Sequence, residues 1–123
     1  MNQIGTAVVV GASTVLLYDL VASLISRRFG IPYGRFSPGS FAVYAVTGSA
    51  AVQPGGLASA ALAGLVVALI EATIGWALSW RLGPGRPPPE RRNASSISTA
   101  IAVVTMTGAI VGAIGGALYR GFR

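Results

Sequence analysis

The sequence lacks cysteine, histidine and lysine, and it has only three acidic residues among 123. Without cysteine or histidine, the usual zinc sites, thiol nucleophiles, Ser-His-Asp triads and histidine-ligated haem groups are excluded. Three carboxylates are also too few for a carboxylate-rich metal centre. We therefore expect no metal, no cofactor and no enzymatic activity.

Charged residues make up only 10% of the chain, whereas 53% of the residues are hydrophobic. Soluble domains typically carry about 25% charged residues, so this composition indicates a protein of the lipid bilayer. The net charge is +6, but the arginines that produce it lie between apolar runs rather than along one amphipathic face. This placement argues against nucleic acid as a partner, and the length predicts a single membrane domain over residues 1–123.

Long apolar runs are the main feature that the sequence does contain. A membrane-spanning helix needs about 20 predominantly apolar residues, and three runs meet this requirement. A fourth run, residues 38–53, is shorter and contains Ser40, Thr47, Ser49 and Gln53, so a re-entrant segment is the alternative to a full span there. The predicted fold is all-α and polytopic, with four transmembrane helices at residues 4–26, 38–53, 57–80 and 96–119.

The distribution of arginines favours four spans. With four spans, the loops at residues 27–37 and 81–95 share one side of the membrane and hold seven arginines, while the other side receives only Arg120 and Arg123. The positive-inside rule then places both loops in the cytoplasm and both termini outside. A re-entrant segment at 38–53 would put the two loops on opposite sides. We therefore expect a bacterial inner-membrane protein whose arginine loops contact anionic lipids.

An internal repeat relates the second span to the fourth. Residues 41–56 ("FAVYAVTGSAAVQPGG") align without a gap on residues 101–116 ("IAVVTMTGAIVGAIGG"). Chance matches are common in glycine- and alanine-rich sequence, so the shared Thr-Gly pair carries most of the weight. The identical positions are Ala42/Ala102, Val43/Val103, Thr47/Thr107, Gly48/Gly108, Gly55/Gly115 and Gly56/Gly116.

The first and third spans correspond as well. Asp19 aligns with Glu71, and each acid is followed by a Ser-x-Arg-x-Gly sequence. Two tandem helical hairpins account for both correspondences, with repeat one at residues 1–56 and repeat two at residues 57–123. Because each copy contains two spans, the copies enter the membrane in the same direction. They should form a parallel pseudo-repeat about an axis along the membrane normal.

The two intramembrane acids share helix faces with small residues. Glu71 lies on the same face as Gly64, and Asp19 on the same face as Ala22 and Ser23. Small residues mark close helix contacts in membranes, so both acids should face other helices rather than lipid. Two roles are open for them, either polar contacts that hold helices together or a pathway for protons or other ions.

Each acid has a threonine at a similar depth on the following span. A rise of about 1.5 Å per residue, counted from the arginine side, puts both pairs near the same level. We therefore expect hydrogen bonds of Thr47 with Asp19 and of Thr107 with Glu71. The alternative is that the two acids meet each other across the pseudo-two-fold axis.

Glycines are expected at the closest helix contacts. The last span carries three of them at intervals of four residues, a glycine zipper that permits close approach of two backbones. The second span lacks the middle glycine of this stripe, so the fourth helix should make a contact that the second does not, within the bundle or with another chain. The helix-packing glycines are Gly48, Gly64, Gly108, Gly112 and Gly116.

Three classes of function follow from these features. The preferred one is a non-catalytic accessory or structural subunit that packs against a larger membrane complex or assembles with itself. The alternative is a small oligomeric transporter or channel coupled to protons or cations through Asp19 and Glu71. An intramembrane enzyme is disfavoured, because no nucleophile or metal-binding set accompanies the two acids.

Overall fold

The chain is helical throughout its described part. The computed structural model describes residues 2–84 and 86–122, apart from the side chains of residues 53–55, and contains no strand among them. The prediction of an all-α protein is therefore confirmed. The elements are α1 (Gln3–Phe29), the 3₁₀ turn η1 (Tyr33–Phe36), α2 (Ser37–Ile70), the π-helical turn η2 (Glu71–Gly75), α3 (Trp76–Leu82), the 3₁₀ turn η3 (Pro89–Arg91) and α4 (Ala94–Phe122).

Local sequence explains where α1 begins and where α1 and α3 end. Asn2 caps the N-terminus of α1, because its side chain accepts a hydrogen bond from a backbone N–H of the first turn. Gly30, with φ 69°, ends α1, and Gly83, with φ 113°, ends α3. Glycine is favoured in this position because positive φ strains other residues. These are the two glycines of the repeated Ser-x-Arg-x-Gly sequence.

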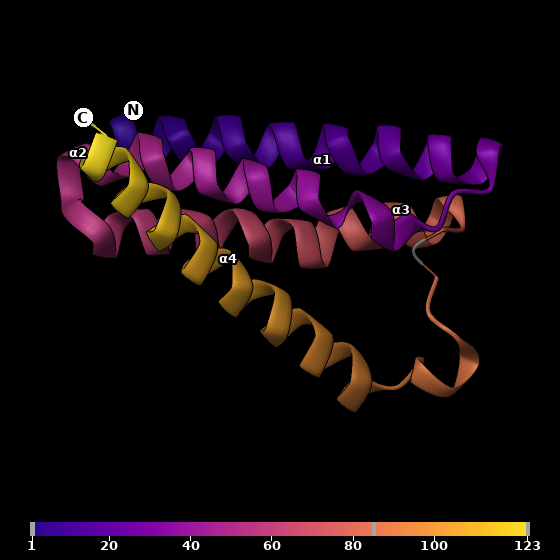
Figure 1. Ribbon diagram of the computed structural model, residues 1–123. Helices are drawn as coiled ribbons and strands as arrows, with labels where there is room; N and C mark the ends of the chain where they lie inside the picture. Colours follow the sequence, from indigo (N-terminus) through magenta and orange to yellow (C-terminus); the bar gives the residue numbers. More distant parts are fainter. Residues whose placement is uncertain (1, 85, 123) are drawn as a thin grey trace.

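α2 reverses its direction at Gly56, whose φ of 76° and ψ of −166° lie outside the helical range. Glycine adopts such angles at little cost because it has no Cβ. The reversal divides α2 into a first arm (residues 37–55) and a second arm (residues 57–70), which run in opposite directions (Figure 1). The gap between the second and third predicted spans, residues 54–56, therefore contains this glycine.

The helices form an elongated bundle that is open on one side. Three elements lie alongside one another, namely α1, α2 with its two arms, and α3 (Figure 1). The C-terminal half of α4 crosses α2, and the N-terminal half of α4 diverges from the bundle. Both termini lie at one end of the bundle. The segments that connect α1 to α2 and α3 to α4 lie at the opposite end, which we call the loop end.

Three helices are long and apolar enough to cross a membrane, namely Gln3–Phe29, Gly56–Leu82 and Ala94–Phe122. They match three of the four spans predicted from the sequence. The remaining predicted span, residues 38–53, lies within the first arm of α2, which is helical and contacts α1 but is not among those three. Large apolar side chains are exposed on the outside of the bundle, which is compatible with insertion into lipid.

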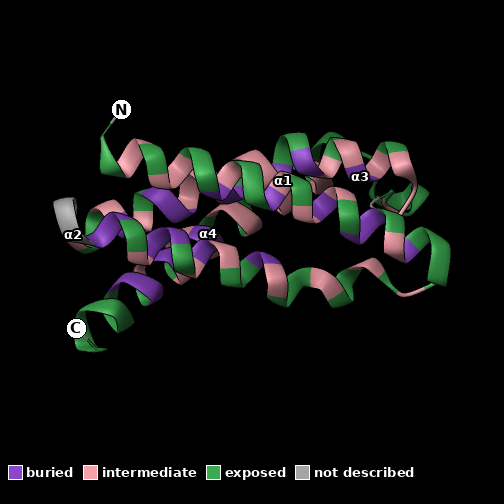
Figure 2. Ribbon diagram, turned by 90° about the horizontal axis from the view of Figure 1, so that it is seen from above, coloured by how far each residue is buried: buried purple, intermediate pink, exposed green. Residues whose placement is uncertain are grey.

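Glycines set the distance between α4 and α2. Buried residues gather where these helices cross (Figure 2). A Cβ on Gly48 would lie less than 3.0 Å from the backbone of Gly112. A Cβ on Gly64 would also lie less than 3.0 Å from the backbones of Gly108 and Gly112. Gly116 lies at the same crossing, where an added Cβ would meet the side chains of Ala60 and Val52. All five glycines that the sequence predicts at helix contacts are buried.

Alanine at Gly48 should destabilise the protein. The added methyl group meets the backbone of α4, which cannot move as a side chain could, so a loss of about 1–3 kcal/mol is expected. Thermal or denaturant unfolding in detergent micelles measures this loss. Gly121→Ala is the matched control, because Gly121 is also helical but has no atom within 4 Å of an added Cβ. Equal stability of the two variants would contradict the packing described here.

Candidate functional site

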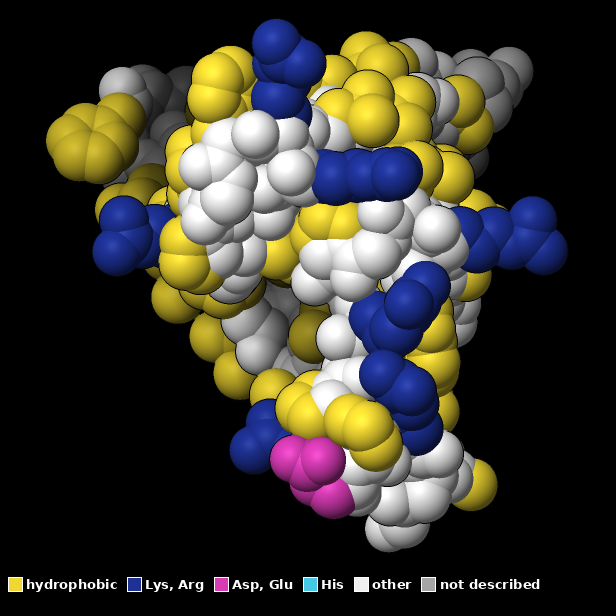
Figure 3. All heavy atoms as spheres, turned by 90° about the vertical axis from the view of Figure 1, so that its right-hand side faces the viewer, with side chains coloured by type: hydrophobic (Ala, Val, Ile, Leu, Met, Phe, Trp, Pro, Cys, Tyr) yellow, Lys and Arg dark blue, Asp and Glu magenta, His cyan; other side chains and the backbone are white. Residues whose placement is uncertain are grey.

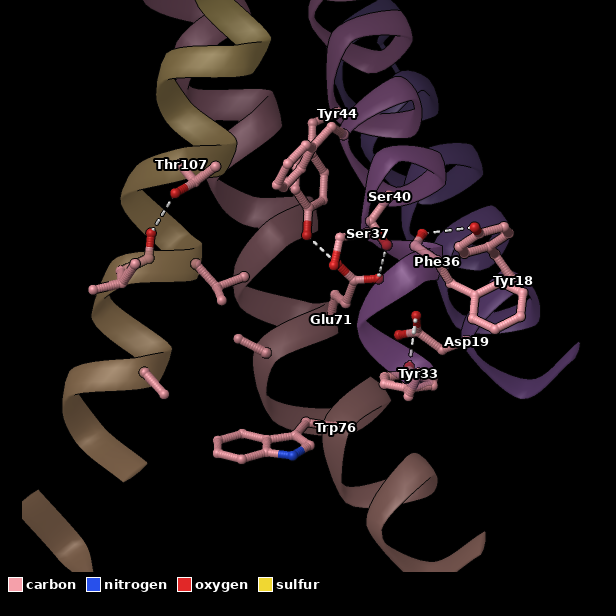
Figure 4. Close-up of a pocket in the computed structure, with 15 residues that line it drawn as sticks. Tyr18, Asp19, Tyr33, Phe36, Ser37, Ser40, Tyr44, Glu71, Trp76 and Thr107 are labelled. Carbon is pink, nitrogen blue, oxygen red and sulfur yellow. Dashed lines mark hydrogen bonds between the residues drawn. The ribbon is translucent and has the colours of Figure 1, made fainter. Parts of the chain in front are cut away.

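A cavity of about 390 Å³ lies between the bundle and the diverging half of α4. Both intramembrane acids line it, although they come from helices far apart in the sequence. Hydroxyl groups and aromatic rings make up much of the remaining wall (Figure 4). The lining residues are Tyr18, Asp19, Tyr33, Phe36, Ser37, Ser40, Phe41, Tyr44, Glu71, Ala72, Trp76, Ala100, Val103, Val104 and Thr107.

Glu71 occupies the point where the α-helical pattern of the third span is interrupted. It opens the π-helical turn η2, a type of irregularity that is frequent at functional sites. Both of its carboxylate oxygens accept hydrogen bonds from the first arm of α2. The Ser40 hydroxyl donates to Oε2 at 2.7 Å, and the Tyr44 hydroxyl donates to Oε1. Glu71 thus ties the π-helical turn η2 to the first arm of α2.

Asp19 is more deeply buried and less well satisfied than Glu71. Its side chain is only 3% exposed. The Tyr33 hydroxyl donates a long hydrogen bond of 3.4 Å to Oδ1, while Oδ2 is buried and accepts none from the described residues. Oδ2 points at Gly75 in the π-helical turn, where any Cβ would collide with it. A buried oxygen without a donor is rare in proteins and costly.

The two carboxyl groups belong to one electrostatic site. They are close enough to interact directly, and Figure 4 shows both beside the same cavity. Among the described residues, none of those that line the cavity carries a positive charge. Two negative charges in such an apolar environment repel strongly, and a proton or a bound cation relieves that repulsion.

Tyr33 connects this cavity to the outside at the loop end. It lines both the cavity and a separate cleft of about 630 Å³ that is formed partly by Arg27, Arg81 and Arg86. Burial raises the pKa of Tyr33 to about 12, although a hydrogen bond with Ser79 lowers it. The phenol therefore keeps its proton at neutral pH and acts as the donor to the carboxylate.

Two buried serines extend the polar contacts toward the loop end. The Ser23 hydroxyl of α1 donates to the Ser79 hydroxyl of α3 at 2.9 Å, and both hydroxyls interact with Tyr33. Hydroxyl groups can both donate and accept, so they can reorganise around a change of charge. Polar groups thus continue from Asp19 to the arginine-lined cleft.

The threonines do not make the hydrogen bonds expected from the sequence. Thr47 donates to the Val43 carbonyl at 2.8 Å, and Thr107 donates to the Val103 carbonyl at 2.7 Å. A threonine inside a helix readily bonds the carbonyl four residues earlier, which removes the need for a distant acceptor. Thr47 packs on Gly11 outside the cavity, whereas Thr107 lines the cavity wall opposite Glu71 (Figure 4).

Sequence reasoning missed the actual donors, which are Tyr33, Ser40 and Tyr44. Ser40 and Tyr44 are four residues apart and therefore lie on one helix face. Their spacing was a usable signal, because a serine and a tyrosine on one face of an apolar span need a polar partner. Tyr33 gave no such signal, since it lies in the connection between α1 and α2.

The described residues define an all-helical bundle of apolar helices with an acidic and aromatic cavity inside it. No protein-family model matches the chain, and comparisons with curated proteins and with solved structures also give no match. Its function must therefore be argued from the cavity itself.

The hydrogen bond between Tyr44 and Glu71 should be measurable as a coupling energy. Removing one partner leaves the other buried without its bond, which costs about 1–3 kcal/mol. In a double-mutant cycle of Tyr44→Phe and Glu71→Leu, which has no acceptor oxygen, the two losses should fail to add by about 1 kcal/mol or more. Unfolding in detergent measures each variant. The control cycle pairs Glu71→Leu with Tyr119→Phe, a residue that is 41% exposed on α4, and should be additive. Additive losses in the first cycle would contradict the contact.

Proposed function

We propose that the chain is a small integral membrane carrier that binds a proton or a cation between Asp19 and Glu71. The observation that carries this proposal is the unpartnered Oδ2 of Asp19, buried beside a second carboxyl group. A proton supplies what this oxygen lacks, and a cation in the cavity balances the charge of the pair. Intramembrane acids that face a cavity commonly mark such pathways.

The hydrogen bonds that the two carboxyl groups accept favour this role over a purely structural contact. Glu71 alone meets the requirements of helix-to-helix adhesion, because both of its oxygens accept hydrogen bonds. Among the described residues, Oδ2 of Asp19 has no donor and the bond to Oδ1 is long. A proton shared with the neighbouring carboxyl group of Glu71 makes up this deficit, and a pair that takes up and releases a proton is suited to a carrier.

Access to the carboxyl pair is available along two routes. The polar contacts through Tyr33 reach the arginine-lined cleft and suit protons, because each hydroxyl can pass one on. The second route lies beside the diverging half of α4, whose residues Ala100, Val103 and Val104 form one cavity wall. That wall is apolar and suits a molecule that arrives from lipid.

A second candidate function is the accessory or structural subunit expected from the sequence. The observation that favours it is the outer face of α4, where Met106, Ile110 and Ile114 are all more than half exposed. Lipid covers such a face, and so can a helix of a larger complex. Reproducible co-purification with one complex in mild detergent supports this function, and a carboxyl pair without any effect on transport would favour it over the carrier.

The proposed topology keeps four spans, arranged as two tandem hairpins. The first arm of α2 has 19 helical residues and a length of about 28 Å, close to the thickness of the hydrocarbon core. Arginine side chains gather at the loop end (Figure 3). The positive-inside rule then assigns this end to the cytoplasm of a bacterial cell, against anionic lipids, with both termini outside.

Single cysteines can test this topology without interference, because the chain has no cysteine of its own. Arg35→Cys and Arg91→Cys, one in each loop, should react with a membrane-impermeant maleimide only after cells are permeabilised. Gly121→Cys, near the C-terminus, should react in spheroplasts, which lack the outer membrane but keep the inner membrane intact. Labelling of Arg35→Cys and Arg91→Cys from opposite sides would contradict four spans and favour a re-entrant first arm.

Transport should depend on both acids. Proteoliposomes with the wild-type chain should dissipate an imposed pH gradient faster than protein-free liposomes when sodium or an organic cation is supplied on the opposite side. Combined Asp19→Asn and Glu71→Gln should reduce this rate to background, because neither replacement can exchange a charge. A pH-sensitive dye inside the vesicles measures the rate.

Glu90→Gln is the matched control for that experiment. Glu90 is the third acid of the chain, lies exposed in η3 and does not line the cavity. Its replacement should leave the rate unchanged. Circular dichroism and gel filtration establish that the double variant remains folded. Wild-type rates at the background level with every cation, or a double variant as fast as the wild type, would overturn the carrier proposal.

A further inference from the structure

The aromatic residues of this chain are concentrated around the carboxyl pair. Six of its ten aromatic residues line the cavity, although they are spread over four elements of the fold. Apolar packing elsewhere in the bundle is achieved almost entirely by alanine, valine and glycine. Aromatic side chains thus gather around the cavity rather than in the buried core. The six are Tyr18, Tyr33, Phe36, Phe41, Tyr44 and Trp76.

Aromatic rings and carboxylates together recognise organic cations. The negative faces of Trp, Tyr and Phe attract a positive charge, and recognition of quaternary ammonium groups is a common use of this attraction. The cavity adds two acidic side chains and, among the described residues, no basic one. Its volume of about 390 Å³ falls within the usual range for small-molecule sites.

A metal ion fits this cavity less well than an organic cation. Calcium takes six to eight oxygen ligands, and magnesium demands a near-ideal octahedron. No group of three or more His, Cys, Asp or Glu side chains able to hold a metal lies together in residues 2–84 and 86–122. The aromatic rings that surround the two acids cannot complete a coordination shell.

We infer that the cavity binds a monovalent organic cation with an aromatic or quaternary ammonium group. Its charge lies beside the carboxyl groups of Asp19 and Glu71, and its apolar part lies against the rings and the α4 wall. This inference rests on the proposed carrier function and names the class of its substrate. The cation enters beside α4 rather than through the cleft, because Arg27, Arg81 and Arg86 repel positive charge there.

Binding of benzyltrimethylammonium tests this inference. This probe carries a permanent charge and an aromatic ring, and neopentylbenzene has the same shape without the charge. Trp80→Phe leaves Trp76 as the single tryptophan of the chain, so the fluorescence of a cavity residue reports binding. The protein is placed in nanodiscs of zwitterionic phosphatidylcholine, which has no net charge. Binding of the charged probe should change this fluorescence saturably and displace a proton from the carboxyl pair of the protein. The neutral analogue should bind at least about tenfold more weakly.

Two sets of variants locate the bound probe. Adding Asp19→Asn and Glu71→Gln should weaken binding by more than about tenfold, whereas Glu90→Gln should not change it. Ala100→Phe fills the cavity from α4 and leaves both acids intact, so it should also abolish binding. Ala102→Phe is its matched control, because Ala102 lies two residues away on an exposed face of the same helix. It should bind like the Trp80→Phe background.

The outcomes separate this inference from the carrier proposal. Equal binding of the charged and neutral compounds, or unchanged binding after Ala100→Phe, overturns the organic-cation site. If the probe does not bind while proteoliposomes still exchange protons for sodium, the substrate class is wrong and the carrier proposal stands. If neither binding nor exchange occurs, both are overturned.

Discussion

The close contact between α4 and α2 is the constraint from which the rest of the structure follows. Two helix backbones can touch only where glycine removes the Cβ, and the glycines of α4 between Gly108 and Gly116 all lie in its C-terminal half. The N-terminal half of α4 carries alanine, valine and threonine instead, and it diverges from the bundle (Figure 1). The same helix thus seals one end of the bundle and leaves a cavity at the other. The proline-rich connection between α3 and α4, which includes the turn η3, is long enough to allow this divergence.

Burial of the two carboxyl groups imposes a second constraint, which the bundle meets unequally. Each group leaves water at a considerable cost unless hydrogen bonds replace its hydration. Glu71 recovers these bonds from the first arm of α2 and so stabilises the reversal at Gly56. Among the described residues, Asp19 recovers a long bond from Tyr33, and its Oδ2 has no donor. In the proposed carrier, this difference gives the acids separate tasks. Glu71 holds the site together, and Asp19 takes up the proton.

Much of the fold could be predicted from the sequence, because hydropathy and glycine spacing act locally. The helix boundaries, the turn at Gly56 and the inward placement of both acids all follow from patterns within single segments. The partners of the acids did not follow, since a repeat predicts equivalent neighbours only if both copies pack alike. They do not, because α1 lies alongside the first arm of α2, whereas α4 packs closely on the third span through its C-terminal half and diverges from it toward the N-terminus of α4 (Figure 1). The π-helical turn was also beyond prediction. This turn rotates the side chains that follow Glu71 to a different face of the helix, and no residue of Glu71–Gly75 requires a π-helical conformation.

The geometry of the acid pair limits what the proposed carrier can do with a proton and an organic cation. Both relieve the same repulsion, and both compete for the carboxylate oxygens of Asp19 and Glu71. Binding of either one must weaken binding of the other, and by thermodynamic linkage the two effects are equal in size. A site of this kind therefore exchanges one positive charge for another. Such exchange needs no large closing movement, because the protonated pair and the cation-bound pair carry similar charge and make similar demands on Tyr33, Ser40 and Tyr44. The hydroxyl groups of these three residues line the cavity and can reorient in place to meet either demand.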